Sequence, residues 1–353
     1  CLIQIKIHFT LIFIKQTNEF YLGETKIAII TLLESIRLAM YEELKRDSSI
    51  IILGEDIGRK GGVFLATDGF IDEFGPDRII DTPLAESSIA GVALGAALNG
   101  IRPIAEIQFA DFIWPAINQI VGEASKAHYG TFGQLYAPIV IRTPFGGGVK
   151  GGLYHSQSIE VIFSHTPGLK VVVPSTPYDA KGLLKSAIRD DNPVIFLEHK
   201  HTYRSVKGDV PDFDYTIPIG KADVKLKGDD LTIISYGLMV HYCIQVANTM
   251  KMEGINLEVI DLRSLRPLDV TTLVESVKKT GKCLMVQEDT QAYGIGAEIA
   301  SCIADLAFEY LDGPVKRLSG PEVPPMPFSP SLEDEFMLNE QKIQTAVKDL
   351  LKY

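Results

Sequence analysis

The sequence predicts an α/β protein with two domains, each built on a parallel sheet, and two observations support this prediction. Short apolar runs alternate with stretches of helical spacing, and the alternation occurs twice, on either side of a segment rich in Pro, Gly and Asp. The chain has 353 residues, 46% of them hydrophobic, which is enough to build two cores. Continuous apolar strands separated by helices are typical of parallel sheets covered on both faces.

The first alternation predicts a domain over residues 24–203. Amphipathic stretches at 31–47 and 177–191 have the spacing of helices that cover a sheet. In open parallel sheets, ligands bind at the carboxyl ends of the strands, so the loops that leave these strands are where we expect a site. The expected strands are the apolar runs at 50–56, 102–109, 138–144, 169–175 and 193–199.

Residues 204–230 lose this periodicity and are predicted to be a linker, followed by a smaller α/β domain over residues 231–353. The first 23 residues are different in character. They lack an initiator Met, and lysines and His8 interrupt their apolar runs, which are too short for a membrane span. We interpret them as an atypical N-terminal extension, a fragment edge or translated upstream sequence, and assign them no function. Strands of the second domain are expected within 231–237, 257–267, 282–289 and 315–321.

Composition and charge argue against several classes of function. The net charge is −11 and no basic block compensates it, so neither nucleic acid nor an anionic membrane surface is an expected partner. Four cysteines, Cys1, Cys243, Cys283 and Cys302, form no CxxC pair and no Cys/His cluster, which argues against structural zinc and a disulfide framework. We therefore expect a cytoplasmic location. There is also no GxSxG motif of a hydrolase.

The segment 81–100, DTPLAESSIAGVALGAALNG, contains an acid in an otherwise uncharged run. Glu86 is followed by fourteen residues without a charge, which predicts a buried helix and a buried acid. Gly91 and Gly95 lie four apart, on one face of that helix, where they would let another helix come close. Two interpretations remain open: Glu86 stabilises a helix N-terminus, by about 0.3–1 kcal/mol, or it is a catalytic acid.

Two further segments follow predicted strands. In 106–120, Phe109, Phe112 and Trp114 surround Asp111, which indicates either a core cluster or an aromatic wall for a flat ligand. In 142–158, five glycines in seven positions lead to Tyr154 and His155. The spacing matches neither GxGxxG nor GxxxxGK[ST], so a nucleotide loop is not expected. His155 is either structural or, at the end of a flexible loop, a group for proton transfer.

These three segments resemble the beta subunit of the thiamine-diphosphate-dependent decarboxylating component of 2-oxo acid dehydrogenase complexes. The resemblance runs from about Lys26 and includes LGEDIGRKGGVF, PSTPYDAKGLL, VIDLRSLRPLD and RLSGPEVPPMP. It implies a thiamine-diphosphate-binding fold of the pyrimidine type followed by a transketolase C-terminal-like domain. QFADF and LYHSQS are most similar to branched-chain 2-oxo acid dehydrogenases. Pyruvate or acetoin dehydrogenase is the alternative, and a non-catalytic assembly subunit that docks the acyltransferase core is a second one.

The resemblance also implies roles for individual residues. Glu86 would face the aminopyrimidine ring of thiamine diphosphate and hydrogen-bond a ring nitrogen, while Leu84 and Phe112 would contact that ring. Family members often have tyrosine where Phe112 stands. His155 would line the substrate channel and help to transfer the acyl group to a lipoyl group. Lys150 stands where histidine is common, and His201 lies where relatives vary.

Partners and ions follow from the same resemblance. The chain has no GDG motif for magnesium and diphosphate, so an alpha subunit should supply that half of the site in an alpha2/beta2 heterotetramer. The complex would also contain a lipoyl acyltransferase core and would act on a 2-oxo acid substrate. Family members can hold a structural potassium ion, here through the carbonyls of Ala137, Ile139, Val140 and Ala187 with Asp190 and Asn192.

Overall fold

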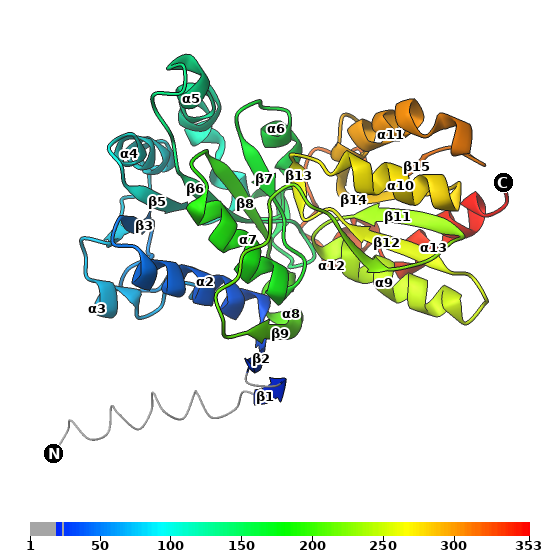
Figure 1. The fold of residues 1–353 in the computed structure, drawn as a ribbon, viewed down its shortest axis with the longest axis horizontal. Helices are drawn as coiled ribbons and strands as arrows, with labels where there is room; N and C mark the ends of the chain where they lie inside the picture. Colours follow the sequence, from blue (N-terminus) through cyan, green and yellow to red (C-terminus); the bar gives the residue numbers. More distant parts are fainter. Residues whose placement is uncertain (1–18, 23–24) are drawn as a thin grey trace.

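The computed structural model describes the backbone of residues 19–22 and 25–353 and side chains from Ile27 onward. Most of the expected N-terminal extension, residues 1–18 and 23, lies outside these residues. Its end forms strand β1 (Glu19–Leu22), which pairs with β2 (Thr25–Thr31). The rest of the chain forms two α/β units side by side, as Figure 1 shows, and confirms the predicted fold class.

The first unit is built on a seven-stranded sheet in the order β13-β7-β8-β6-β5-β3-β4. All neighbours in it are parallel except β13, an antiparallel edge strand. The five predicted strands are present, each shorter than expected, and β7 has only three residues. Strand β4 was not predicted, because three residues give no visible periodicity. The strands are β3 (Ile50–Gly54), β4 (Ile79–Asp81), β5 (Arg102–Glu106), β6 (Val140–Phe145), β7 (Lys170–Val172), β8 (Val194–His199) and β13 (Ser264–Arg266).

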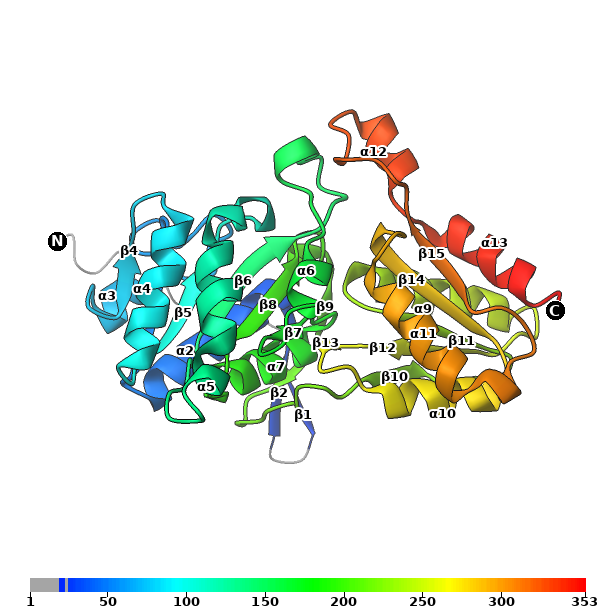
Figure 2. The same ribbon diagram turned by 90° about the horizontal axis from the view of Figure 1, so that it is seen from above.

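Helices cover both faces of this sheet (Figures 1 and 2). Helices α2 (Leu32–Arg46) and α7 (Pro177–Arg189) pack together on one face, and α4 (Glu86–Leu98) and α6 (Glu160–Ser164) cover the other. Helix α2 begins with a complete capping box, in which the Thr31 hydroxyl accepts from the Glu34 amide and the Glu34 carboxylate accepts from the Thr31 amide.

The second unit contains a five-stranded sheet in the order β10-β12-β11-β14-β15, parallel except for β10. Its helices also lie on both faces, with α9 and α13 on one side and α10 and α11 on the other. The elements are β10 (Asp223–Leu226), β11 (Leu231–Ser235), α9 (Leu238–Lys251), β12 (Leu257–Asp261), α10 (Val270–Thr280), β14 (Cys283–Thr290), α11 (Ile295–Leu306), β15 (Lys316–Gly320) and α13 (Glu340–Leu350).

Two segments differ from the sequence-based expectation. The run 257–267 is two strands rather than one: β12 belongs to the second sheet, Arg263 turns the chain at a positive φ of 56°, and β13 joins the first sheet. The expected linker contains two strands. Strand β9 (Lys207–Pro211) is an edge of a three-stranded sheet in the order β1-β2-β9, and β10 is an edge of the five-stranded sheet. Their sequences, KGDVP and DVKL, lack an apolar run. The proposed boundaries at 203 and 231 remain a prediction.

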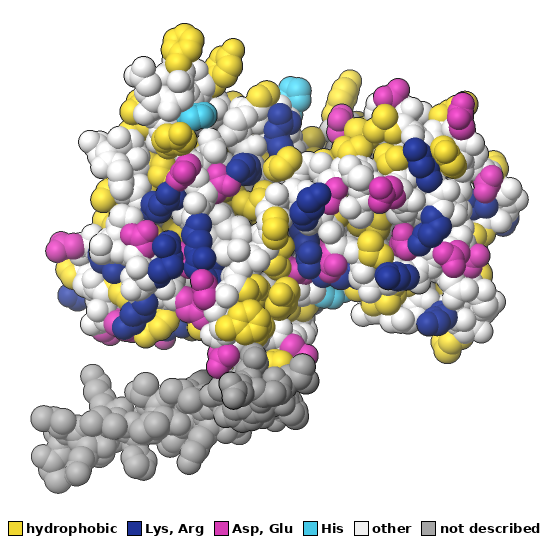
Figure 3. All heavy atoms as spheres, viewed as in Figure 1, with side chains coloured by type: hydrophobic (Ala, Val, Ile, Leu, Met, Phe, Trp, Pro, Cys, Tyr) yellow, Lys and Arg dark blue, Asp and Glu magenta, His cyan; other side chains and the backbone are white. Residues whose placement is uncertain are grey.

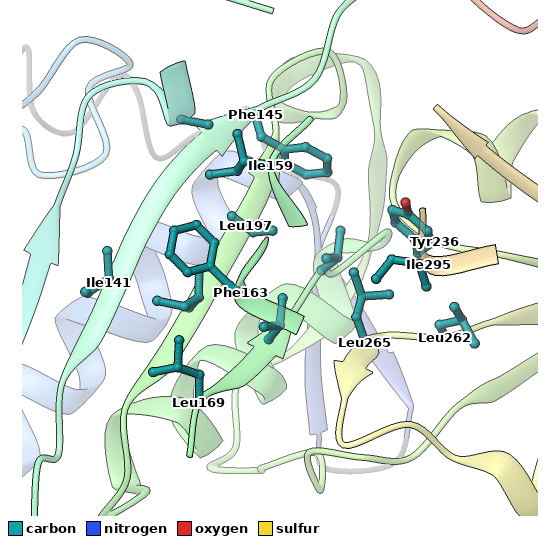
Figure 4. Close-up of a cluster of buried hydrophobic side chains, with 14 of the residues drawn as sticks. Ile141, Phe145, Ile159, Phe163, Leu169, Leu197, Tyr236, Leu262, Leu265 and Ile295 are labelled. Carbon is teal, nitrogen blue, oxygen red and sulfur yellow. The ribbon is translucent and has the colours of Figure 1, made fainter. Parts of the chain in front are cut away.

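The two units share one hydrophobic core. A continuous cluster of buried side chains runs from Phe163 and Phe145 in the first unit, past Leu265 on β13, to Tyr236 and Ile295 in the second (Figure 4). Burial of this much apolar surface on both sides is the main force that holds two packed layers together. The second unit is therefore fixed against the end of the first sheet at which β6 and β8 finish.

A buried ion pair joins three neighbouring strands of the first sheet. The Arg142 guanidinium on β6 donates to the Glu106 carboxylate on β5 at 2.6 Å and to the Glu198 carboxylate on β8 at 2.7 and 2.8 Å. Burial favours neutral arginine, but the carboxylates of Glu198 and Glu106 outweigh it and raise the pKa of Arg142 above its usual value. The Tyr203 hydroxyl donates to Glu198 as well.

Replacing Arg142 with methionine should destabilise the protein strongly, because it leaves two carboxylates buried without their cation. We expect the free energy of unfolding to fall by about 3–5 kcal/mol. Denaturant unfolding followed by circular dichroism measures this fall. Arg204→Met, at an exposed arginine shortly after β8, is the control and should cost less than about 0.5 kcal/mol. Equal midpoints for the two variants would contradict the role given to the ion pair.

Candidate active site

The predicted site residues lie on loops that leave the carboxyl ends of neighbouring strands. Leu84 and Glu86 follow β4, Phe112 follows β5 and His155 follows β6. Glu86 is the first residue of α4, which packs against β3, β5 and the 3-10 turn Trp114–Ala116. This packing directs the start of α4 toward the loop that follows β5.

Glu86 is half-buried, so the expectation of a buried acid is wrong for this chain. Helix α4 buries one face, with Ile89 and Ala93, against the sheet and exposes the other. Val92 is 58% exposed, and a Cβ added at Gly95 would meet no described atom within 4 Å. The lack of charge in α4 therefore reflects an apolar outer face that no described residue covers.

The Glu86 carboxylate has no hydrogen bond or ion pair with another described residue. Its charge acts on Glu55, which lies just after β3. Burial raises the pKa of Glu55, and the charges of Asp56 and Glu86 raise it further. Leu84, 72% exposed, lies two residues before Glu86. The start of α4 thus offers an unpaired acid beside an exposed apolar side chain.

Phe112 and His155 lie together. The His155 ring is 5.4 Å from the Phe112 ring and 4.6 Å from the Phe109 ring, and both contacts are edge-on. Phe109 also meets Phe64 edge-on at 5.7 Å. The His155 ring therefore packs edge-on against the aromatic cluster after β5, an arrangement that the quadrupoles of aromatic rings favour. Within the described part of the chain, the His155 ring nitrogens have no hydrogen-bond partner, so they are available to a ligand.

The segment that carries His155 is tied to the loop after β5. One carboxylate oxygen of Asp111 accepts from the amides of Ser156 and Gln157, both at 3.2 Å. The other Asp111 oxygen is buried and has no described partner. Asp111 therefore fixes the backbone directly after His155, a role that the sequence did not assign to it.

Sequence reasoning also missed a buried lysine behind the aromatic wall. The Lys200 ammonium, just after β8, lies 5.9 Å from the centre of the Phe109 ring and has no hydrogen-bond partner among the described residues. Burial lowers the pKa of Lys200 to about 8, and the nearby carboxylates of Asp111 and Glu288 limit the fall. The titratable run EHKH at the end of a predicted strand was the signal that could have revealed it.

The residues expected to hold potassium gather at the opposite end of the sheet. The Ile139 carbonyl accepts from the Val194 amide at 2.9 Å, and the Ala187 carbonyl accepts from the Asp190 amide at 3.3 Å. Asp190 pairs with the Lys170 ammonium and accepts from the Asn192 amide. Ala137 and Val140 lie at the start of β6 in the same corner. The corner thus offers oxygen atoms, but Asp190 already has a cationic partner.

The described residues contain neither a candidate metal-ion cluster nor a candidate membrane-spanning helix. In that part of the chain, no group of three or more His, Cys, Asp and Glu side chains is arranged to hold a metal ion. No helix there has the length and apolar character needed to cross a membrane. On the face drawn in Figure 3, acidic and basic side chains are interspersed over both units.

Comparisons with known proteins agree with this architecture. The pyrimidine-binding domain of transketolase matches residues 29–206, and the transketolase C-terminal domain matches residues 220–343. The structure is also similar to a solved chain described as a split gene transketolase, inactive beta4 tetramer, with a TM-score of 0.72 over 92% of this chain and 98% of that one. At 24% identity, this likeness supports the fold alone.

Sequence relatives define the family more closely. The chain is 54% identical to the 2-oxoisovalerate dehydrogenase subunit beta of Bacillus subtilis (strain 168) and 46% identical to the pyruvate dehydrogenase E1 component subunit beta of the same organism. Each match spans 326 residues, which is 92% of this chain and the whole length of the relative. The chain therefore belongs to the family of 2-oxo acid dehydrogenase beta subunits, built from transketolase-type pyrimidine-binding and C-terminal domains.

Proposed function

We propose that this chain is the beta subunit of a branched-chain 2-oxo acid dehydrogenase. The enzyme would oxidatively decarboxylate 2-oxo acids and transfer the acyl group to lipoyl groups of an acyltransferase. The observation that carries this proposal is the 54% identity to a 2-oxoisovalerate dehydrogenase beta subunit, against 46% to a pyruvate dehydrogenase beta subunit of the same organism over an equal length. A cytoplasmic location remains our expectation.

The residues at the start of α4 fit the pyrimidine half of thiamine diphosphate. The Glu86 carboxyl group is unpaired within the described chain, and Leu84 and Phe112 offer apolar and aromatic surface on neighbouring loops. When bound, the cofactor would supply a nucleophilic thiazolium carbon and a positively charged ring that serves as the electron sink for decarboxylation. Glu86 would share a proton with a pyrimidine ring nitrogen, and a water-poor cleft would strengthen that hydrogen bond.

His155 would act on the substrate side of the same site. Its ring is held edge-on by Phe109 and Phe112, which fixes the ring plane without using either nitrogen. An imidazole with free ring nitrogens can serve as a proton donor or acceptor. We assign it to the acyl transfer step, in which the lipoyl disulfide is the two-electron acceptor. One sulfur would bond to the acyl carbon as the S–S bond breaks, and His155 would donate a proton to the sulfur that leaves.

An alpha subunit would complete the site. The outer face of α4 is apolar, and with Gly95 uncovered it leaves room for a close helix contact beside Glu86. In our proposal this face lies against a partner in an alpha2/beta2 heterotetramer, and the partner holds the diphosphate and magnesium. The structural potassium ion also remains a proposal, in which it would share Asp190 with the Lys170 ammonium.

Replacing Glu86 with glutamine should abolish decarboxylation while preserving the shape of the side chain. We expect the rate with an artificial electron acceptor to fall by about 100-fold or more, since an amide cannot share the proton. The assay uses the chain reconstituted with its alpha subunit and compares 3-methyl-2-oxobutanoate with pyruvate. Glu275→Gln, at an exposed position on α10, is the control. Normal turnover of the Glu86 variant, or a clear preference of the wild type for pyruvate, would reject the proposal.

Replacing His155 with alanine should slow acyl transfer more than decarboxylation. We expect acyl transfer to lipoyl protein to fall about tenfold further than the rate with an artificial acceptor, because only the former step needs the proton donor. Single-turnover measurements of both steps on the same preparation give this ratio. His128→Ala, at a histidine that stacks on Tyr136 instead, is the control. Equal losses in both steps would count against the assignment.

Replacing Gly95 with leucine tests the outer face of α4. The side chain has free space in the single chain, so the stability of the isolated subunit should stay within about 1 kcal/mol of wild type. Assembly with the alpha subunit should weaken by about 1–3 kcal/mol, because the face would be overpacked. Mass photometry measures assembly, and Thr345→Leu on the exposed side of α13 is the control. Unimpaired assembly would place the contact elsewhere.

A further inference from the structure

The glycine-rich loop, residues 146–152, is shaped by the second unit of the protein. Figure 2 shows that the loop leaving β6 and helix α12 (Pro330–Phe336) project on the same side of the molecule. A Cβ added at Gly147 would lie 2.2 Å from the Sδ atom of Met326, and one added at Gly152 would lie 2.8 Å from the Phe328 ring. The glycines therefore let the segment that precedes α12 approach the loop backbone.

The loop backbone also has a conformation that favours glycine. Gly146, Gly148 and Gly152 have φ values of 82°, 75° and 64°, and Lys150 has a φ of 59°. Alternating conformations of this kind turn successive amides toward one side, which in other proteins creates anion-binding concavities. Here the protein itself provides the anions.

Glu333 on α12 binds this concavity. One of its oxygens accepts from the amides of Gly148 and Lys150 at 3.1 and 3.0 Å, and the other accepts from the Lys150 amide at 3.1 Å. Glu333 is 3% exposed, so these charge-assisted hydrogen bonds are shielded from water. Lys150, the residue that departs from the family pattern, thus has its amide held although its side chain is exposed.

Glu288 on β14 holds the start of the same loop. Its carboxylate accepts from the Gly147 amide at 2.7 Å and pairs with the His199 imidazole at 2.8 Å. Asp111 holds the backbone just after His155, at the other end of the loop. Three carboxylates therefore fix the loop, and two of them come from the second unit. Glu288 is part of a buried network, whereas the hydrogen bonds of the Glu333 carboxylate to described residues all go to the loop, so Glu333 can be tested separately.

We propose that Glu333 is a positioning residue, which fixes the glycine-rich loop and thereby places His155 for acyl transfer. This inference rests on the proposed function of His155. Without the Glu333 carboxylate, the amides of Gly148 and Lys150 lose their acceptors, and glycines that allow a tight turn also allow many others. The loop would then sample several conformations, and His155 would leave the Phe109 and Phe112 rings for part of the time.

Two variants of Glu333 and one control test the proposal in the reconstituted enzyme. Glu333→Ala removes both acceptors, Glu333→Gln keeps one amide oxygen, and Glu335→Gln changes an exposed acid on the same helix. Hydrogen exchange of peptides covering 146–158 reports loop order independently of activity. In Glu333→Ala we expect faster exchange there, and acyl transfer about tenfold lower relative to decarboxylation. Glu333→Gln should be intermediate and Glu335→Gln should match wild type.

Each outcome bears on one claim. Unchanged loop exchange in Glu333→Ala would overturn the proposal, whatever the rates. Faster exchange with intact acyl transfer would overturn the positioning role if His155→Ala does impair that step. If His155→Ala itself spares acyl transfer, the proposed function of His155 fails, and loop exchange alone decides whether Glu333 fixes the loop. Should Glu333→Ala not assemble, Glu333→Gln supplies the same comparison with a smaller expected change.

Discussion

The site depends on one buried ion pair, between Arg142 on β6 and the carboxylates of Glu106 and Glu198 on the strands at either side. A guanidinium that is fully withdrawn from water needs its partners in fixed geometry, so the ion pair sets the register of three strands at once. Those strands end in the loops that carry Phe112, His155 and Lys200. The carboxyl edge of the sheet is thus held rigid beneath the glycine-rich loop that follows β6.

The second unit contributes to the site rather than merely following it in sequence. It shares a hydrophobic core with the first unit, and it supplies Glu288 and Glu333 to the backbone of the loop before His155. Helix α4 is different, because no described residue covers its outer face. One side of the site is therefore completed within the chain, while the side that contains Glu86 is left open. This asymmetry fits a subunit whose cofactor lies between two polypeptides.

Much of this could be predicted from local sequence. Apolar runs predicted most strands of both sheets, though not β4 or β10, and the strand-end rule directed attention to Glu86, Phe112 and His155. The burial of Glu86 was predicted wrongly, because an uncharged helix looks the same in sequence whether its apolar face meets its own chain or a partner. Lys200, at the end of β8, was overlooked although the same strand-end rule applied to it. Arg142 and Glu198 are solitary charges inside apolar strands, and this pattern could have indicated the buried ion pair.

The contacts of Glu288 and Glu333 could not be read in this way. Glu333 acts on a loop more than 180 residues earlier in the chain, and only the packing of the two units brings them together. The glycines near 146–152 suggested a flexible or phosphate-binding loop. A sequence shows where the backbone can adopt unusual conformations, but it does not show which contacts require them. In the folded protein the same freedom serves close packing against Met326 and Phe328.

We propose that this chain holds only half of a thiamine diphosphate site. Isothermal titration calorimetry of the cofactor, with magnesium, into this chain alone, the alpha subunit alone and the reconstituted pair tests this proposal. We expect tight binding, with one cofactor per alpha–beta pair, only in the reconstituted sample. Binding of equal affinity to this chain alone would contradict it.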